Sequence, residues 1–139
     1  MHVTYALAAK IAPFFQDAIT NTPETKIDAI SQFKCQGGLF LAAGCAEGVD
    51  LPYDECRLNL IPVLYRDNFG ADVVQKRLAE PNGRKNYDLK TIRTTIQQVG
   101  RSNRAVDDSS VCVVGDMGLR LLLSRYRGEI SPDFARSIK

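Results

Sequence analysis

The sequence predicts an α/β domain whose sheet is mainly parallel, and three features indicate this class. Three short apolar runs have the length of strands buried within a sheet. Segments with helical spacing of apolar residues lie between these runs. Strands that alternate with helices are typical of parallel sheets covered by helices. The 139 residues are enough for one core, so we expect a single domain over residues 1–139.

The first elements should be two helices. Residues 6–16 contain good helix formers, and Pro13 should interrupt or end this helix. The second helix should begin near Thr22, which can cap it, while Pro23 suits the first helical position. Glu24 complements the positive end of this helix. Its apolar face should comprise Ile27, Ile30 and Phe33.

The strands and the remaining helices follow in alternation. The predicted strands are residues 39–43, 58–64 and 111–114. Helices are predicted over residues 71–78, 89–101 and 119–125. Because ligands of parallel sheets bind at the carboxyl ends of the strands, functional residues are expected in the loops after Ala43, Leu64 and Val114.

Composition excludes several classes of protein. The chain is 45% hydrophobic and 24% charged, as in ordinary soluble domains. No apolar run is long enough to span a bilayer and the N-terminus does not resemble a signal peptide, so we expect a cytoplasmic protein without a membrane partner. The four cysteines form no CxxC pair, which argues against a metal site or an iron–sulfur cluster and favours reduced, partly or wholly buried thiols.

Basic side chains are concentrated in the middle of the chain. The formal net charge is only +2, but residues 76–104 carry eight Lys or Arg against two acids. Residues 1–75 carry five basic and nine acidic side chains. A basic middle segment favours a phosphate-bearing partner such as a nucleotide or a nucleic acid, although such runs are often solvated faces.

Two segments have the residue types of a nucleotide site. Residues 44–52 (GCAEGVDLP) follow a predicted strand, and their glycines allow a tight turn while Glu47 and Asp50 offer carboxylates. Residues 97–104 (QQVGRSNR) end a predicted helix on which Lys90, Arg93, Gln97, Arg101 and Arg104 form one stripe. Guanidinium groups suit phosphoryl oxygens. Each segment also fits a plainer interpretation, an ordinary polar loop and a solvated basic face.

Together, the two segments resemble motifs V and VI of superfamily 2 helicases, and the EGxD form with QxxGR resembles the XPD/DinG group. The resemblance covers roughly residues 20–116. It implies the second, C-terminal half of an ATP-dependent DNA helicase. The implied fold is the three-layer α/β RecA-like (P-loop NTPase-like) domain with a mainly parallel sheet and without a P-loop of its own.

The resemblance implies a role for each matching residue. Arg104 matches the arginine finger, with Arg101 beside it as the second catalytic candidate. The implied ATP-binding residues are Glu47, Gly48, Asp50, Gln97 and Gly100. The implied nucleic-acid-binding residues are Asn21, Thr22, Gly44 and Cys45, the first two through a helix N-terminus. No metal ligand is implied.

The resemblance also indicates what this chain lacks. It contains no GxxxxGK[ST] loop and no DEAH-like acidic motif. ATP and Mg²⁺ should therefore be bound mainly by a P-loop-containing first helicase domain, and the isolated chain should be inactive. Single-stranded DNA is the expected polymer, although nothing here distinguishes DNA from RNA.

Two further expectations concern assembly and the alternative function. Residues 3–5 resemble only the tail of the family's first strand, so an unpaired N-terminal edge could support a homodimer. The alternative function is a non-catalytic adaptor or regulatory domain that keeps the fold and binds a protein partner.

Overall fold

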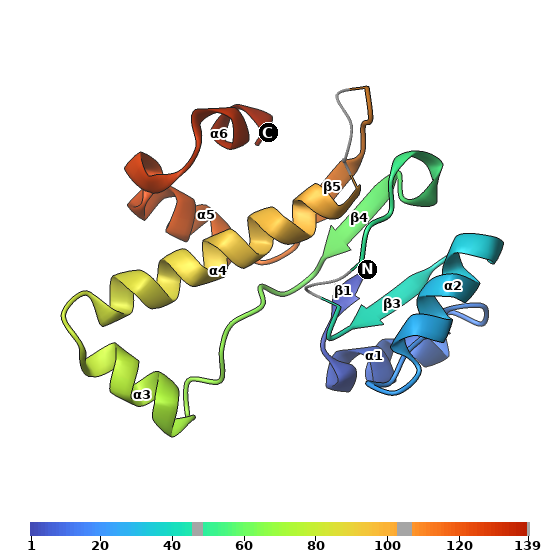
Figure 1. Ribbon diagram of the computed structural model, residues 1–139, viewed down its shortest axis with the longest axis horizontal. Helices are drawn as coiled ribbons and strands as arrows, with labels where there is room; N and C mark the ends of the chain where they lie inside the picture. The colour runs from blue at the N-terminus through green and yellow to red at the C-terminus, as the bar shows by residue number, and fades with distance from the viewer. Residues whose placement is uncertain (46–48, 103–106, 139) are drawn as a thin grey trace.

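The computed structural model describes residues 1–45, 49–102 and 107–138. Its strands are β1 (His2–Val3), β2 (Ile19–Thr20), β3 (Phe40–Ala43), β4 (Leu58–Ile61) and β5 (Val111–Val114). Its helices are α1 (Tyr5–Ile11), α2 (Lys26–Gln36), α3 (Asp72–Ala79), α4 (Gly83–Val99), α5 (Met117–Arg125) and α6 (Pro132–Ser137). Figure 1 shows the helices arranged around short strands, which confirms the α/β class.

All strand pairs among the described residues are parallel, but they form two hydrogen-bonded sheets. One sheet has the order β1-β3-β2, and the other pairs β4 with β5. β1 lies beside β4, but the described residues form no strand pairing between them. The two sheets therefore lie edge to edge, with β1 and β4 at the adjoining edges (Figure 1). The N-terminal segment therefore lies between β3 and β4, and a homodimer through it remains a prediction.

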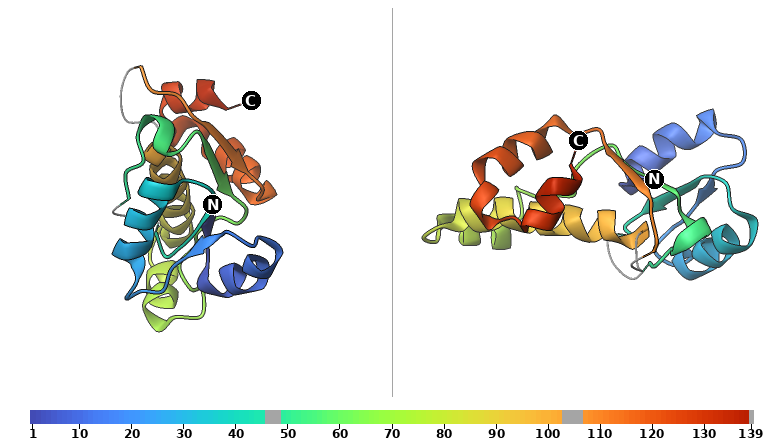
Figure 2. Two further views of the ribbon diagram at one scale, coloured as in Figure 1. Left: turned by 90° about the vertical axis from the view of Figure 1, so that its right-hand side faces the viewer. Right: turned by 90° about the horizontal axis from the view of Figure 1, so that it is seen from above.

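Helices cover both faces of β3, which is buried along its whole length as predicted. Phe40 packs against Phe33 of α2, with ring centroids 5.5 Å apart. Leu41 and Ala43 point the other way and pack against Ala8 of α1. In the right-hand view of Figure 2, α1 and α2 lie on opposite sides of β3, as expected for three layers.

The predicted apolar face of α2 is only partly correct. Phe33 is buried and Ile30 half-buried, but Ile27 is 77% exposed. The buried face is completed instead by Ala29, one turn before Phe33. The prediction was wrong for Ile27, because the sheet contacts a narrower stripe of α2 than the spacing of its apolar residues indicates.

β4 and β5 are covered differently on their two faces. On one side, Leu89 and Ile92 of α4 pack with Leu119 and Leu122 of α5. On the other side, Leu58, Val111 and Val113 are exposed. The expectation that all predicted strands are buried on both faces was thus wrong for these two strands, since the described residues place no helix over these side chains.

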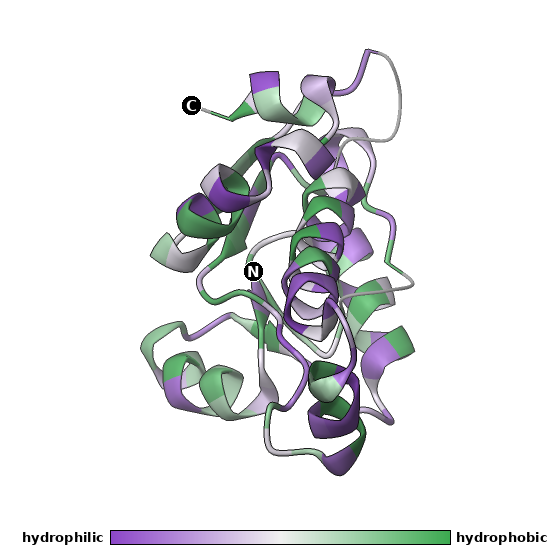
Figure 3. Cartoon of the chain, turned by 90° about the vertical axis from the view of Figure 1, so that its left-hand side faces the viewer, coloured by the Kyte–Doolittle hydropathy of each residue, from purple (hydrophilic) through white to green (hydrophobic). Residues whose placement is uncertain are grey.

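Helix α4 begins six residues earlier than predicted. Gly83 permits this start, because a Cβ there would lie 2.1 Å from the carbonyl oxygen of Arg77. The close approach joins α3 and α4 at a sharp corner. α4 carries hydrophobic and hydrophilic residues along its length (Figure 3), and its hydrophobic residues Leu89 and Ile92 lie in the core.

The other helices match the prediction more closely. α1 ends at Ile11 and continues as a 3-10 turn through Pro13. Before α2, Thr22 and Thr25 each accept a hydrogen bond from the other's backbone N–H, at 3.2 and 2.9 Å. These reciprocal hydrogen bonds stabilise the turn that leads into the helix. The predicted start of α2, with Thr22 as the cap and Pro23 in the first helical position, was wrong, because residues 23–25 form a turn and the helix begins at Lys26. None of the described helices is long and apolar enough to cross a membrane.

Candidate functional site

The first candidate segment leaves β3 through a tight turn at Gly44. Its φ of 63° lies in the left-handed region, where a residue without Cβ is favoured. A Cβ would also lie 2.8 Å from the hydroxyl oxygen of Tyr5. Cys45 follows with 1% of its surface exposed, and its thiol donates to the carbonyl oxygen of Ala43 at 3.3 Å. The next described residues of the segment, Val49 and Asp50, contact Arg101.

Asn21 connects β2 to this turn. Its side-chain Nδ2 donates to the carbonyl oxygen of Ala43, and its Oδ1 accepts from the N–H of Ala43, both at 2.9 Å. Asn21 is 7% exposed, and Cys45 is also buried. Of the four predicted nucleic-acid-binding residues, Asn21 and Cys45 have buried side chains that hydrogen-bond to Ala43, while Thr22 is exposed. Contacts from Asn21 and Cys45 to a nucleic acid would have to come from the backbone.

Arg101 joins the two candidate segments. Its Nη1 donates to the carbonyl oxygen of Val49 at 3.0 Å and lies 3.5 Å from Oδ1 of Asp50. The backbone N–H of Leu51 donates to the carbonyl oxygen of Arg101 at 3.1 Å. The Arg101 side chain is 13% exposed, whereas Asp50 is 62% exposed. An arginine shielded from water and paired in this way fixes one segment against the other.

Three other members of the basic stripe, Lys90, Arg93 and Gln97, point outward. Arg93 and Gln97 are exposed on α4, and Lys90 is exposed while its Nζ lies 2.6 Å from Oδ2 of Asp67. Gly100 begins the 3-10 turn of residues 100–102, and no atom lies within 4 Å of where its Cβ would be. Of the predicted site residues, Asp50 and Arg101 are brought together, while Gln97 does not join them.

Three predicted residues lie outside the described parts of the chain. They are Glu47 and Gly48 of the first segment and Arg104 of the second. Their predicted roles in ATP binding and as the arginine finger remain predictions.

The position of the site relative to the strands differs from the expectation. The first segment does start at the carboxyl end of β3, but it runs back toward the start of β4. Ser102 bonds Ser110, the residue before β5, with 2.9 Å between their hydroxyl oxygens. The second segment therefore lies at the amino ends of β4 and β5, since α4 runs antiparallel to them. The loops after Leu64 and Val114 follow the carboxyl ends of β4 and β5, and functional residues in them remain a prediction.

A cavity of about 70 Å³ lies between the two sheets. His2, Asn59 and Arg101 contribute polar groups to its lining. Burial, the N-terminal ammonium and Arg101 lower the pKa of His2 to about 4, so its imidazole is neutral at neutral pH. A space of this size holds water molecules and is too small for a nucleotide.

The cysteines are thiols of different exposure. Cys45 is buried, Cys56 and Cys112 are half-buried, and Cys35 is exposed, so the predicted burial holds for three of them. Burial raises the pKa of Cys45 and Cys56 and raises that of Cys112 to about 11. Within residues 1–45, 49–102 and 107–138, no group of three or more His, Cys, Asp or Glu side chains could hold a metal ion.

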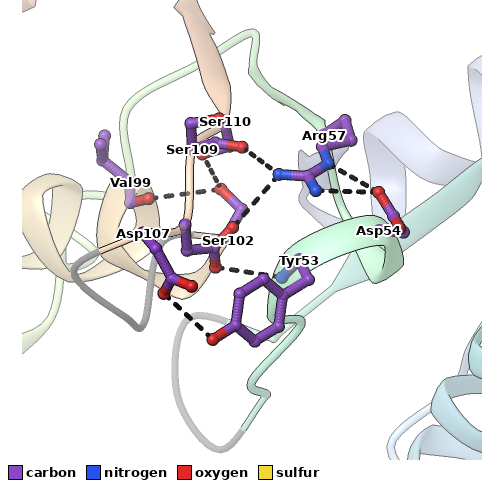
Figure 4. Close-up of polar contacts among 9 residues, drawn as sticks. Tyr53, Asp54, Arg57, Val99, Ser102, Asp107, Ser109 and Ser110 are labelled. Atoms are coloured by element: carbon purple, nitrogen blue, oxygen red, sulfur yellow. Dashed lines mark hydrogen bonds and ion pairs between the residues drawn. The ribbon is translucent and has the colours of Figure 1, made fainter.

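Sequence reasoning missed a polar network beside the two segments. Figure 4 shows Arg57 reaching toward Asp54 on one side and toward Ser109 on the other. Asp108 also bonds Arg57 and has a side chain that is fully buried. A buried acid within an otherwise polar loop has no periodic signal, so the sequence could not indicate the role of Asp108.

Comparison with known families agrees with this geometry. The family model described as the helicase C-terminal domain matches residues 3–136, nearly the whole chain. No curated protein matches the chain. The matched range includes both candidate segments and the elements that position them. The chain therefore belongs to the helicase C-terminal domain family and is of the DinG/XPD-like type.

Proposed function

We propose that this chain is the C-terminal half of an ATP-dependent superfamily 2 DNA helicase and that it supplies motifs V and VI to an ATP site between two domains. The observation that carries the proposal is the contact of Arg101 with Val49 and Asp50. These residues belong to segments 52 positions apart. Their junction places acidic and basic groups together, as a site for ribose and phosphate needs.

The nucleotide would be held between this junction and a P-loop-containing first domain. That domain would provide the loop around the β- and γ-phosphates and the acids that hold Mg²⁺. Asp50, 62% exposed, is accessible to a ligand. Arg104 is the proposed arginine finger, and Arg101 is the second catalytic candidate, whose contacts also hold residues 49–51 against residues 100–102. Without the first domain, this chain should bind ATP weakly and should not hydrolyse it.

Single-stranded DNA is the proposed polymer, and its phosphates would run past the turn after β3. Thr22 is exposed and follows Asn21, whose side chain bonds Ala43, the residue before Gly44. Binding through the phosphate backbone would give little sequence preference. In this proposal, cycles of ATP binding and hydrolysis change the separation of the two domains and move the strand.

The proposal is tested with the chain joined to a P-loop-containing first domain. DNA-stimulated ATP hydrolysis is measured for Arg101→Ala and for Arg93→Ala, a control that removes an exposed arginine from α4. We expect Arg101→Ala to lower kcat by roughly a hundredfold or more, because an arginine serving phosphoryl transfer is removed. Arg93→Ala, on the exposed face, should stay within about twofold of the unchanged protein.

Two results would contradict the proposal. If the Arg101→Ala variant and the unchanged protein hydrolyse ATP at equal rates, the proposed role of Arg101 in an ATP site is wrong. The alternative function, a non-catalytic adaptor that binds a protein partner, would then be favoured. The exposed side chains of Leu58, Val111 and Val113 are the feature that favours such a partner. Hydrolysis stimulated only by single-stranded RNA would replace DNA as the polymer.

A further inference from the structure

We infer that Asp108, together with Arg57, is a positioning residue for Arg101, an inference that rests on the proposed ATP site. Asp108 lies seven positions after Arg101, and its side chain has no exposed surface. A buried carboxylate is costly unless it is paired and hydrogen-bonded. The contacts that Asp108 makes therefore indicate what it is there to hold.

Asp108 binds both ends of the connection after the first candidate segment. Its Oδ2 accepts from the backbone N–H of Tyr53 at 3.0 Å, and its Oδ1 lies 3.3 Å from Nη1 of Arg57. The same Nη1 donates to the carbonyl oxygen of Ser109 at 2.8 Å. Residues 53–57 are thus fastened to residues 108–109 at several points (Figure 4).

The arginine is itself fixed from the opposite side. Nε of Arg57 donates to Oδ1 of Asp54 at 2.9 Å, and Nη2 lies 2.9 Å from the same oxygen. Asp54 is 93% exposed, whereas Asp108 is buried. Arg57 thereby spans two acids, one at the surface and one inside. The planar guanidinium can make these contacts at once, which a lysine could not.

The contacts of Asp108 and Arg57 adjoin both of the backbone segments that Arg101 connects. Tyr53 follows Leu51, whose N–H bonds the carbonyl oxygen of Arg101, by two residues. On the other side, Ser102 adjoins Arg101 and bonds Ser110. Asp108 therefore sets the separation between the two backbone segments that Arg101 bridges. Loosening it should misplace the Arg101 guanidinium without removing it.

The test uses the chain joined to its P-loop-containing first domain and compares Asp108→Asn with Asp54→Asn. Asparagine keeps the shape of Asp108 and one acceptor, while Asp54→Asn removes a charge from the exposed partner of the same arginine. We expect Asp108→Asn to lower kcat about 10- to 100-fold, since small misplacements of reacting groups have effects of this size. KM for ATP and affinity for single-stranded DNA should change less than about threefold. Asp54→Asn should lower kcat less than Asp108→Asn does, because this partner of Arg57 is exposed and an asparagine there still accepts a hydrogen bond from Nε of Arg57.

A double variant separates positioning from a general loss of stability. If Asp108 acts through Arg101, Arg101→Ala with Asp108→Asn should be no slower than Arg101→Ala by itself. Multiplied effects, or an Asp108→Asn variant as active as the unchanged protein, would overturn the inference. If Asp108→Asn does not fold, Arg57→Lys replaces it under the same criteria. A normal Arg101→Ala variant would instead overturn the proposed ATP site.

Discussion

The side-chain amide of Asn21 bonds both the N–H and the carbonyl oxygen of Ala43, at 2.9 Å each. Asn21 directly follows β2, and Ala43 is the last residue of β3. The amide thus continues the pairing of these strands by one position with a side chain in place of a backbone. It does so at the point where the chain turns at Gly44 toward the candidate site.

Replacing Asn21 should therefore weaken the fold. Asn21→Leu leaves the buried N–H of Ala43 without a partner and leaves its carbonyl oxygen with only the thiol of Cys45. We therefore expect a loss of about 1–3 kcal/mol in the free energy of unfolding. Urea unfolding followed by circular dichroism measures this loss. The control is Asn86→Ala, on the exposed surface of α4, which should change the value by less than about 0.5 kcal/mol. Equal stability of both variants would contradict the structural role of Asn21.

Gly83 should not tolerate a larger residue. In Gly83→Ala, the new Cβ would lie 2.1 Å from the carbonyl oxygen of Arg77 and 2.7 Å from that of Leu78, and both are backbone atoms. Separating α3 from α4 should lower the unfolding free energy by about 2 kcal/mol or more. Thermal unfolding of Gly83→Ala and Gly128→Ala gives the comparison, because no atom lies within 4 Å of a Cβ at Gly128. A similar midpoint for both variants would show that the corner is not as tight as described.

Stability should fall as the pH drops below neutrality, in part through His2. Its pKa is lowered from 6.5 to about 4 in the folded protein, chiefly by burial. The unfolded chain therefore binds more protons than the folded one between these values. Lowering the pH through this window favours unfolding, by about 2 kcal/mol from pH 7 to pH 5. Between pH 7 and pH 5, the free energy of unfolding should therefore fall by about 2 kcal/mol more in the unchanged protein than in His2→Gln. Parallel curves for the two proteins would exclude the contribution of His2.

Arg104 should be the most sensitive residue of the second candidate segment. In the two-domain protein, Arg104→Ala should reduce ATP hydrolysis roughly a thousandfold and leave DNA binding nearly unchanged, as for other arginine fingers. Arg104→Lys should restore little, because a point charge does not reproduce a two-pronged contact. Single-turnover hydrolysis and fluorescence anisotropy with labelled DNA measure the two effects. If Arg104→Ala retains near-normal turnover, Arg101 becomes the candidate for the finger.

Local sequence patterns were enough to predict the class of the fold and its central elements. The run at residues 39–43 predicted β3, and the apolar spacing along residues 89–101 predicted the second half of α4. Residues 44–52 and 97–104 also indicated the family, because both motifs consist of residues contiguous in the chain. Propensity and periodicity act over one or two helical turns, so they report these features directly.

The sequence could not show which surfaces meet. Phe40, buried beneath α2, and Val111, exposed on β5, are both apolar residues in predicted strands. The faces differ because distant segments cover one strand and not the other. The early start of α4 likewise depends on a backbone contact at Gly83 with the preceding helix.

Residue pairs separated by many positions were decided by the tertiary structure. Asp50 and Arg101 were each predicted as site residues, but only the fold places their charged groups 3.5 Å apart. Asn21 was predicted at a nucleic-acid contact, which stays a prediction, whereas the binding of its amide to Ala43 is visible only in the fold. Asp108 had no local signal at all. A polar side chain acquires its role from partners that the chain brings to it, and burial then makes those hydrogen bonds obligatory.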